Sequence, residues 1–501
     1  MISALILILG LLCQWRIGFN NDNAWLLYIA RRSLEGQVLY RDLIEINPPA
    51  LIWFDQAVVG AARVLHLDPV SLFRIAVAGL AVASAGWSSR LARSSIPESL
   101  RRSAFAGLLF VLILLPVSWF GQREHFVLLL LLPLLATSAA REHGAVGQGS
   151  AMVSGVLAGL GLCIKPQYLI VWLLLLGSQV KARRGWSALR APEHLAVTVT
   201  GAVYLALVLT FTPEYLPMVR RLGGLYAEYR TATLPRLVAG DFAALVILLA
   251  LAILIAYRRL LAPSPARSIL LLATVGLYVG AMLQGKGFDY HYYPALATAL
   301  LLLVMGAATV HSALPSGRRA RIAMLALSSI ATVPYVLAAL RIGVVGDEPG
   351  MRAYRELERA VGPVRGEPVL VLSARSGYAF GLVTYAGADW VGGFPCLWVP
   401  GVLQAERSRG REHLGFEVEQ WFRDVVIGGA ETSQPQVILI SRPAPPEGPP
   451  DLRVDLLDYF STDPRFRNLM TAYRPDGESV GYRIFRRRIT AVESRYQVVQ
   501  P

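Results

Sequence analysis

The chain has 501 residues, of which 54% are hydrophobic and only 16% are charged, and its mean hydropathy is +0.48. Soluble proteins carry about a quarter charged residues, so this composition is typical of a membrane protein. The formal net charge of +14 comes mostly from arginine clusters between apolar segments. No nucleic-acid-binding motif accompanies this charge, so we expect no nucleic-acid partner.

The N-terminal part of the chain alternates apolar and amphipathic segments. Residues 1–15 lack a basic start and a small-residue cleavage site, so we expect an uncleaved first span rather than a signal peptide. From Asn23 to Glu35, apolar residues recur at helical spacing, a pattern that suits a helix lying in the membrane interface. Residues 48–67 are apolar enough to span a membrane, but they carry Asp55 and Arg63.

Ten later runs are apolar enough to be membrane spans: 71–89, 103–120, 124–140, 147–164, 167–180, 195–212, 241–257, 268–284, 293–310 and 322–340. Some are short for a hydrocarbon core about 30 Å thick, so their flanking residues must reach the interface. With the first run they make about eleven transmembrane helices, provided that residues 49–66 lie in the interface.

The distribution of basic residues supports this arrangement. If residues 49–66 do not span, five connections fall on one side of the membrane and contain 15 Lys or Arg: 90–102, 141–146, 181–194, 258–267 and 311–321. The alternate connections contain 7, namely Arg123, Lys165, Arg220, Arg221, Arg230, Arg236 and Lys286. Because basic residues favour the cytoplasmic side, the N-terminus is predicted to be cytoplasmic. The loop over about residues 20–70 is then extracytoplasmic.

From about Gly343 the composition becomes that of a soluble domain. Pro368–Ser373 and Gln436–Ser441 are predicted to be short buried strands, and Tyr482–Arg488 a final edge strand. Met351–Val361 and Leu403–Val426 have helical spacing. We therefore predict an α-helical polytopic membrane domain over residues 1–342 and a small α/β domain over residues 343–501. The odd number of spans places the α/β domain outside the cytoplasm.

This topology brings ionisable residues together on the extracytoplasmic face. Asp22 follows the first span, the run from Gln122 to His125 follows the third, Lys165 separates the fifth from the sixth, and the loop from Gln284 to Tyr292 follows the ninth. Ionisable residues at membrane level are costly, so they are functional candidates by default. Their convergence on one face predicts a site there.

The first loop has a specific order of features. Residues 20–49 read NNDNAWLLYIARRSLEGQVLYRDLIEINPP, with a carboxylate just past a span, then an amphipathic helix, a Tyr-Arg-Asp and a Pro-Pro. This order resembles the first extracytoplasmic loop of the GT-C membrane glycosyltransferases that use polyprenyl-phosphate sugars. Aminoarabinose and protein O-mannosyl transferases are the nearest members in pattern. The resemblance implies transfer of one hexosyl or pentosyl group at the outer face, with inversion.

Transfer from a lipid phosphate needs a base for the acceptor hydroxyl and cations for the phosphate that leaves. Asp22 matches the aspartate to which the family assigns the base, and Glu124 resembles the second acidic position, so both are predicted to be catalytic. The predicted substrate-binding residues are candidate phosphate ligands, sugar-stacking rings and first-loop polar groups: Arg123, His125, Lys165, Lys286, His291, Tyr290, Tyr292, Asn47 and Glu45.

Simpler interpretations stand beside these roles. Asp22 also suits capping of a helix that begins at Asn23. Arg123 and Glu124 could form an interfacial ion pair, and Lys165 could be a lysine that reaches from the apolar layer to the interface. Asp289 and His291 could be hydrogen-bonded loop residues. Asp42 and Glu45 could be solvated or could support other residues.

Two positions depart from the family pattern. Asn23 stands where members often have a second acid, and this weakens a metal-dependent mechanism. The three cysteines, Cys13, Cys163 and Cys396, also lack metal-ligand spacing. We therefore predict neither a metal nor another cofactor. Asn47 replaces a lysine that several members carry before the Pro-Pro, which shifts the expected phosphate contacts to Lys165 and Lys286.

The sequence thus predicts a glycosyltransferase of the bacterial inner membrane, surrounded by membrane lipids. It would move a sugar from a polyprenyl-phosphate-linked donor to an envelope lipid, glycan or protein acceptor. A glycolipid flippase or transporter is an alternative, which would predict paired repeats and broken spans. A non-catalytic envelope assembly subunit is another, which would predict no convergence of acids and bases.

Overall fold

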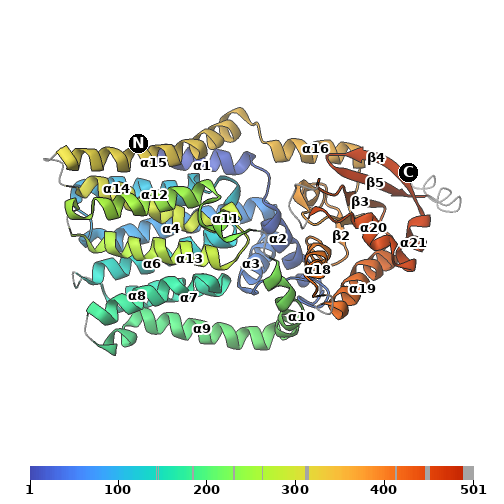
Figure 1. The fold of residues 1–501 in the computed structure, drawn as a ribbon, viewed down its shortest axis with the longest axis horizontal. Helices are drawn as coiled ribbons and strands as arrows, with labels where there is room; N and C mark the ends of the chain where they lie inside the picture. Colours follow the sequence, from blue (N-terminus) through green and yellow to red (C-terminus); the bar gives the residue numbers. More distant parts are fainter. Residues whose placement is uncertain are drawn as a thin grey trace. The chain divides into compact units, whose positions relative to one another are not determined.

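The computed structural model describes residues 1–142, 144, 146–182, 185–229, 232–261, 263–310, 315–411, 415–445 and 452–488. The basic residues Arg183, Arg184 and Arg230, which entered the topology prediction, lie outside these ranges. The chain divides into two compact units (Figure 1). Unit 1 comprises Met1–Asn23, Asn47–Pro213 and Ala232–Glu348, and unit 2 comprises Ala24–Ile46, Glu214–Thr231 and Pro349–Pro501.

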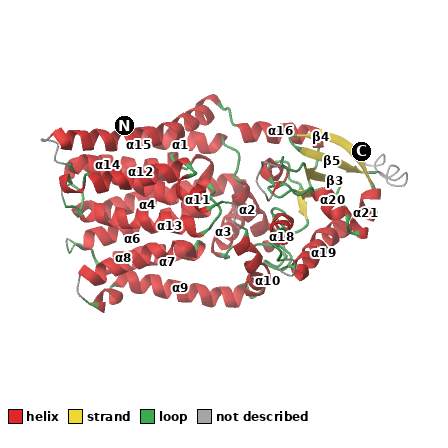
Figure 2. Cartoon of the chain, in the orientation of Figure 1, coloured by secondary structure: helices red, strands yellow, loops and turns green. Residues whose placement is uncertain are grey.

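The named elements of unit 1 are all helices in its described residues, and loops connect them (Figure 2). Its elements are α1 (Ile2–Arg16), α3 (Ala50–Leu65), α4 (Pro69–Leu91), η1 (Ala92–Ser94), α5 (Glu98–Leu109), η2 (Phe110–Leu114), η3 (Val117–Trp119), α6 (Arg123–Arg141), α7 (Gln148–Ile164), η4 (Pro166–Tyr168), α8 (Leu169–Ala182), η5 (Trp186–Arg190), α9 (Pro192–Phe211), α11 (Leu234–Ala239), α12 (Phe242–Ala256), η6 (Arg258–Leu260), α13 (Pro265–Leu283), α14 (Asp289–Thr309), α15 (Pro315–Leu340) and η7 (Arg341–Val345).

Every apolar run that the sequence marked as a span contains a helix, but the helices differ in length. Among the described residues, six helices are long and apolar enough to cross a membrane, or seven if a bent pair at the N-terminus counts as one span. α7 and α12 are apolar but shorter than 18 residues. The polytopic helical fold is therefore confirmed, whereas the number of eleven spans is not.

Two helices form the centre of unit 1. In the most apolar part of α6, 94% of the residues are buried, and in α14 the share is 72%, against 22% in α9. The outer helix α9 instead exposes large apolar side chains such as Val199, Val203 and Phe211, as a lipid-facing helix does. Residues in the first turns of α6 and α14 are consequently held by packing from several sides.

The helices α7 and α9 pack closely because glycines face the contact. A Cβ atom on Gly155 would lie 2.2 Å from the Glu193 carbonyl oxygen, and one on Gly159 would lie 2.7 Å from the Thr200 Cβ. This small-xxx-small spacing lets two helix backbones approach each other. At the same end of the contact, Arg141 at the end of α6 donates two hydrogen bonds of 2.6 Å to the fully buried Glu193 carboxylate.

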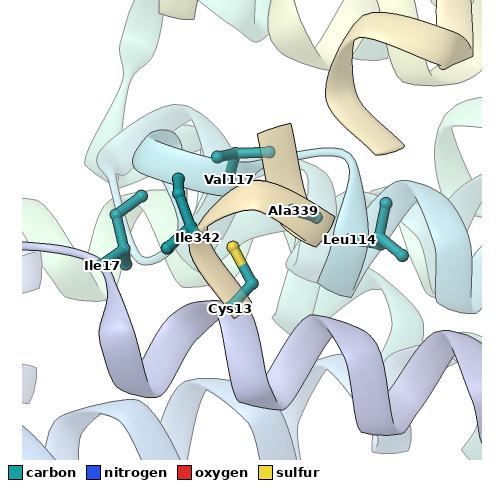
Figure 3. Packing of buried hydrophobic residues seen from close by; sticks show 6 residues of the cluster. All are labelled: Cys13, Ile17, Leu114, Val117, Ala339 and Ile342. Atoms are coloured by element: carbon teal, nitrogen blue, oxygen red, sulfur yellow. The ribbon is translucent and has the colours of Figure 1, made fainter. Parts of the chain in front are cut away.

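The predicted span over residues 103–120 is interrupted. α5 continues into the π-helix η2, and η3 follows as a 3-10 turn. Gly10 lets α1 approach η2, because a Cβ on it would lie 2.5 Å from the Ile113 side chain. Figure 3 shows the apolar cluster at this junction. It contains residues of α1, η2, η3, α15 and η7 and the residue after α1: Cys13, Ile17, Leu114, Val117, Ala339 and Ile342.

Unit 2 contains a five-stranded mixed sheet. Its elements after Pro349 are α16 (Pro349–Val361), β1 (Pro368–Leu372), η8 (Gly377–Ala379), α17 (Phe380–Thr384), β2 (Asp389–Val391), α18 (Val399–Arg407), α19 (Phe416–Ser433), β3 (Val437–Ser441), α20 (Leu456–Ser461), α21 (Pro464–Thr471), β4 (Tyr473–Ser479) and β5 (Tyr482–Arg487). The strand order is β2-β1-β3-β5-β4, with β1 parallel to β2 and β3, and β5 antiparallel to β3 and β4.

Two details of unit 2 differ from the sequence prediction. The predicted edge strand at 482–488 is β5, which lies between β3 and β4, so the prediction of an edge position is wrong. The edge strand on this side of the sheet is β4, which carries Pro475 and an irregular pairing beside it, a position where proline is tolerated. The helix predicted over 403–426 is two helices, α18 and α19, because Gly410 and Gly415 adopt positive φ angles between them.

Unit 2 also includes the helix of the first loop, α2 (Asn21–Leu34), from Ala24 onward, and α10 (Tyr215–Glu228). Residues 24–30 of α2 are buried. The Tyr28 hydroxyl donates to the Trp390 carbonyl and accepts from its N–H at 3.2 and 3.1 Å, and Trp25 packs edge-on against Phe380. The apolar face that the sequence assigned to the membrane interface is therefore covered by the C-terminal part of the chain.

We predict that Gly155→Val disrupts the contact between α7 and α9. The added side chain overlaps the Glu193 carbonyl, and overpacking of this kind costs about 1–3 kcal/mol. Gly149→Val is the matched control, since Gly149 lies in α7 and has no atom within 4 Å of its Cβ position. Equilibrium unfolding in mixed micelles measures both variants. Equal stability of the two variants would contradict the close-packed contact.

Candidate active site

The site begins where the chain from the end of α1 to the start of α2 runs beside η3 and Phe120. The Gln14 amide donates to the Val117 carbonyl at 2.9 Å, the Asn20 amide to Ser118 at 3.2 Å, and the Asn23 amide to Phe120 at 2.9 Å. These three bonds tie the chain around Asp22 to the chain that leads into α6. The fixed pairing determines which side chains of the two segments meet.

Asp22 and Arg123 meet at the end of these paired segments. The Asp22 carboxylate lies 3.0 Å from the Arg123 guanidinium, and their side chains are 40% and 12% exposed. α2 begins at Asn21, and the Asp22 N–H donates to the Asn20 side chain at 2.9 Å. The cap-type hydrogen bond at this helix start is thus made by Asn20, and the Asp22 carboxylate is used in the ion pair.

Glu124, the next residue, is buried inside the bundle. Its carboxylate lies 2.9 Å from the Lys165 ammonium and 3.7 Å from the His291 imidazole, and its side chain is 1% exposed. These three residues come from the start of α6, the break between α7 and η4, and the first turn of α14. Burial lowers the pKa of Lys165, and the neighbouring Glu124 raises it again. The pair compensates two charges that the apolar interior would otherwise exclude.

Lys165 is held in place by a short hydrogen-bond chain. Its ammonium donates to the Gln284 side chain at 3.0 Å, and the Gln284 amide donates to the Tyr168 hydroxyl at 3.4 Å. The Tyr168 hydroxyl in turn donates to the His291 carbonyl at 2.8 Å. The sequence analysis did not assign Tyr168 or Gln284 to the site. The sequence feature that could have identified them is a polar side chain at the end of a predicted span, close to a lysine or histidine already predicted to belong to the site.

The loop after α13 contributes further polar and aromatic groups. Lys286 and His291 are both buried, and His291 lies within electrostatic range of Lys165, Lys286 and Arg123. Tyr290 contacts His291 edge-on with 4.4 Å between ring centroids, and it stacks on Phe288 at 5.6 Å. The structure therefore brings together Arg123, Glu124, Lys165, Lys286 and His291.

Four other predicted substrate-binding residues have surroundings that differ from those of the charged cluster. His125 accepts from the Gly121 N–H at 2.9 Å, and its other ring nitrogen lies 2.8 Å from the Leu112 carbonyl in η2. Tyr292 is fully buried, and its hydroxyl donates to the Leu237 carbonyl. Glu45 belongs to unit 2, where it is buried and accepts from the Trp25 indole at 2.9 Å. Asn47 is half-buried just before α3.

Comparison with solved structures found the fold in other proteins. ArnT from Cupriavidus metallidurans, bound to undecaprenyl phosphate, matches with a TM-score of 0.56 and 13% identity over 96% of each chain. The chain has the GT-C glycosyltransferase fold. The Archaeoglobus fulgidus oligosaccharyltransferase tethered to an acceptor peptide matches with a TM-score of 0.42 and 11% identity, over 88% of this chain and 69% of that one. No protein-family model and no curated protein sequence matches this chain.

The charged cluster of this GT-C fold has an excess of positive charge. Asp22 and Glu124 supply two carboxylates, and Arg123, Lys165 and Lys286 supply three cations, before His291 is counted. Among the described residues, no group of three or more His, Cys, Asp or Glu side chains has a geometry that would hold a metal ion. Such a cluster suits the binding of an anion such as a phosphate, which cationic donors hold through charge-assisted hydrogen bonds.

We predict that Glu124→Ala destabilises the protein strongly, because it leaves Lys165 buried without its counter-ion. Breaking one partner of a buried pair costs about 3–5 kcal/mol. The double variant Glu124→Leu/Lys165→Met is expected to recover part of this loss, because it removes both charges. Asp347→Ala, in the more exposed pair with Arg341, should cost less than about 1 kcal/mol. Equilibrium unfolding of the purified variants provides the measurement, and strictly additive losses in the double variant would contradict the coupling.

Proposed function

We propose that the protein transfers a sugar from a polyprenyl-phosphate-linked donor to an envelope lipid, glycan or protein acceptor on the extracytoplasmic face of the bacterial inner membrane. The observation that carries this proposal is the ion-paired Asp22 beside the cationic cluster of Arg123, Lys165, Lys286 and His291. The GT-C fold and the undecaprenyl phosphate bound to ArnT agree with it.

Asp22 is proposed as the general base that takes the proton of the acceptor hydroxyl. Of the two predicted catalytic acids, Asp22 is 40% exposed, whereas Glu124 is 1% exposed and faces Lys165. An entering acceptor therefore reaches Asp22 without displacing the core. The Arg123 guanidinium orients the Asp22 carboxylate. Attack of the acceptor oxygen on the anomeric carbon then releases the lipid phosphate and inverts the anomeric centre.

The cations are proposed to hold the donor phosphate as its charge increases during bond breaking. Glu124 acts on the donor through Lys165, because it fixes the position of the Lys165 ammonium. Lys286 and His291 approach from the α13–α14 connection, and Tyr290 offers a ring face for the sugar. Because five charged groups compensate one another only partly, the bound phosphate completes the charge balance of the cluster.

We predict that Asp22→Asn keeps the fold but loses about 100- to 10,000-fold in turnover, the range of a general base. Asn is nearly isosteric with Asp, and its amide does not accept a proton at neutral pH. The matched control is Asp68→Asn, because Asp68 caps α4 in the same unit and Asn caps helices equally well. The assay is sugar transfer by purified protein given donor and acceptor, with melting temperatures recorded beside it. A folded Asp22→Asn protein working at the wild-type rate would exclude Asp22 as the base, and absence of transfer by the wild type would favour a flippase.

The proposed orientation has its own test. With the arginine-rich connections in the cytoplasm, the chain after Pro349 lies outside it. An alkaline phosphatase fusion after Arg488 is expected to be active, and a green fluorescent protein fusion at the same point to be dark. The same pair of fusions after Arg141 is expected to give the reverse result and serves as the control. Fluorescence after Arg488 would place Asp22 and the C-terminal sheet in an inverted topology.

A further inference from the structure

A large apolar cavity in unit 1 lies away from the charged cluster. Its volume is about 400 Å³, within the range of roughly 300–1,000 Å³ for small-ligand sites. It is lined by residues of α1, α4, α5, η2, α6, α13, α14 and α15, and all of its lining side chains are apolar or Ser, Thr or Gly. The exposed lining residues Ser103, Val304 and Ala308 show that it reaches the surface of the unit.

The cavity and the charged cluster occupy opposite ends of the same helices. α6 carries Glu124 in its first turn and lines the cavity with Ala136 and Ala139. α14 likewise begins near His291 and lines the cavity up to Thr309. At 1.5 Å per residue, the two sites are about 20 Å apart along each helix. A donor whose phosphate lies beside Arg123 therefore does not place its phosphate at this cavity.

Arginines flank the lining residues. Arg93, Arg101 and Arg267 each precede a lining residue by three positions, namely Ile96, Ala104 and Leu270. In the helices α5 and α13 this spacing places the arginine on the same face as the lining residue. The Arg101 side chain is 33% exposed, and its Nε is buried without a hydrogen-bond partner among the described residues. The Glu98 carboxylate lies 4.0 Å from the Arg101 guanidinium and is itself 89% exposed.

We propose that this cavity binds one acyl chain of an anionic phospholipid, whose phosphate contacts Arg101 and the neighbouring arginines. An apolar cavity in a membrane bundle suits a hydrocarbon chain, and arginines three residues before lining positions suit a lipid phosphate. These connections are also the ones predicted to face the cytoplasm, where the membrane surface is negatively charged. The lipid site is separate from the proposed transferase site and does not depend on its activity.

Photolabelling tests the acyl-chain contact directly. Phosphatidylglycerol with a diazirine in one acyl chain is added to the purified full-length protein in nanodiscs, and labelled peptides are identified by mass spectrometry. We expect labelling of α5 and α14 peptides that line the cavity, and a several-fold loss in Ala308→Trp, which fills it. Ala206→Trp, an exposed position of α9 outside the cavity, should label as the wild type does. Undiminished labelling in Ala308→Trp would overturn the proposal.

Headgroup recognition is tested with a variant that leaves the cavity unchanged. Arg101→Gln is expected to weaken phosphatidylglycerol labelling about fivefold, the equivalent of roughly 1 kcal/mol per arginine. Arg190→Gln, at an exposed position outside the cavity lining, is the matched control. Phosphatidylcholine with the same diazirine should label more weakly than phosphatidylglycerol and be insensitive to Arg101→Gln. Equal labelling by the two lipids would overturn the anionic specificity.

Discussion

The buried pair of Glu124 and Lys165 constrains much of unit 1. A carboxylate and an ammonium persist in an apolar interior only when each compensates the other. Their contact therefore fixes the start of α6 against the break between α7 and η4, and Gln284 extends the contact to the end of α13. The first turn of α6, which is enclosed by apolar packing, is thus also held by an ion pair to the break between two other helical segments.

The same arrangement places two charged neighbours of the chain in different surroundings. Arg123 and Glu124 are neighbours in the chain, yet one faces the partly exposed Asp22 and the other the interior. A helix start provides this division, because successive side chains point in directions about 100° apart. The Asp22 carboxylate thus remains partly accessible, while the buried Glu124 carboxylate is paired with Lys165.

Much of this organisation was predictable because it follows from composition. Apolar runs identified the helices of unit 1, and the alternation of basic connections placed Asp22, Glu124, Lys165 and His291 at one level before any geometry was known. The contacts themselves were not predictable. Nothing in the local pattern of α2 distinguishes a face that covers lipid from one that covers Phe380 and Trp390, because both partners are apolar.

Other differences between the sequence prediction and the structure have local physical causes. The strand β4 contains Pro475 and Gly477, which oppose strand formation, and it forms through its antiparallel pairing with β5. The 403–426 helix prediction failed because helical spacing persists on both sides of Gly410 and Gly415. His125 looked like a ligand in the run QREH. Its role with the backbone of Gly121 and Leu112 depends on an irregular turn that the uniform sequence FVLIL conceals.

That turn, the π-helix η2, also determines how α5 is rotated about its axis relative to the segment that follows η2. Two of its carbonyls accept bonds from other helices, Val111 from the Tyr293 hydroxyl and Leu112 from His125. A π turn holds more residues than an α turn, and each residue of an α-helix advances the chain by about 100°. Rewinding η2 into α geometry would rotate α5 relative to the segment that carries Phe120. The π-helix η2 therefore fixes the rotation of α5, which lines the apolar cavity, relative to the residues from Val117 to Phe120. Those residues are the ones that pair with the chain around Asp22.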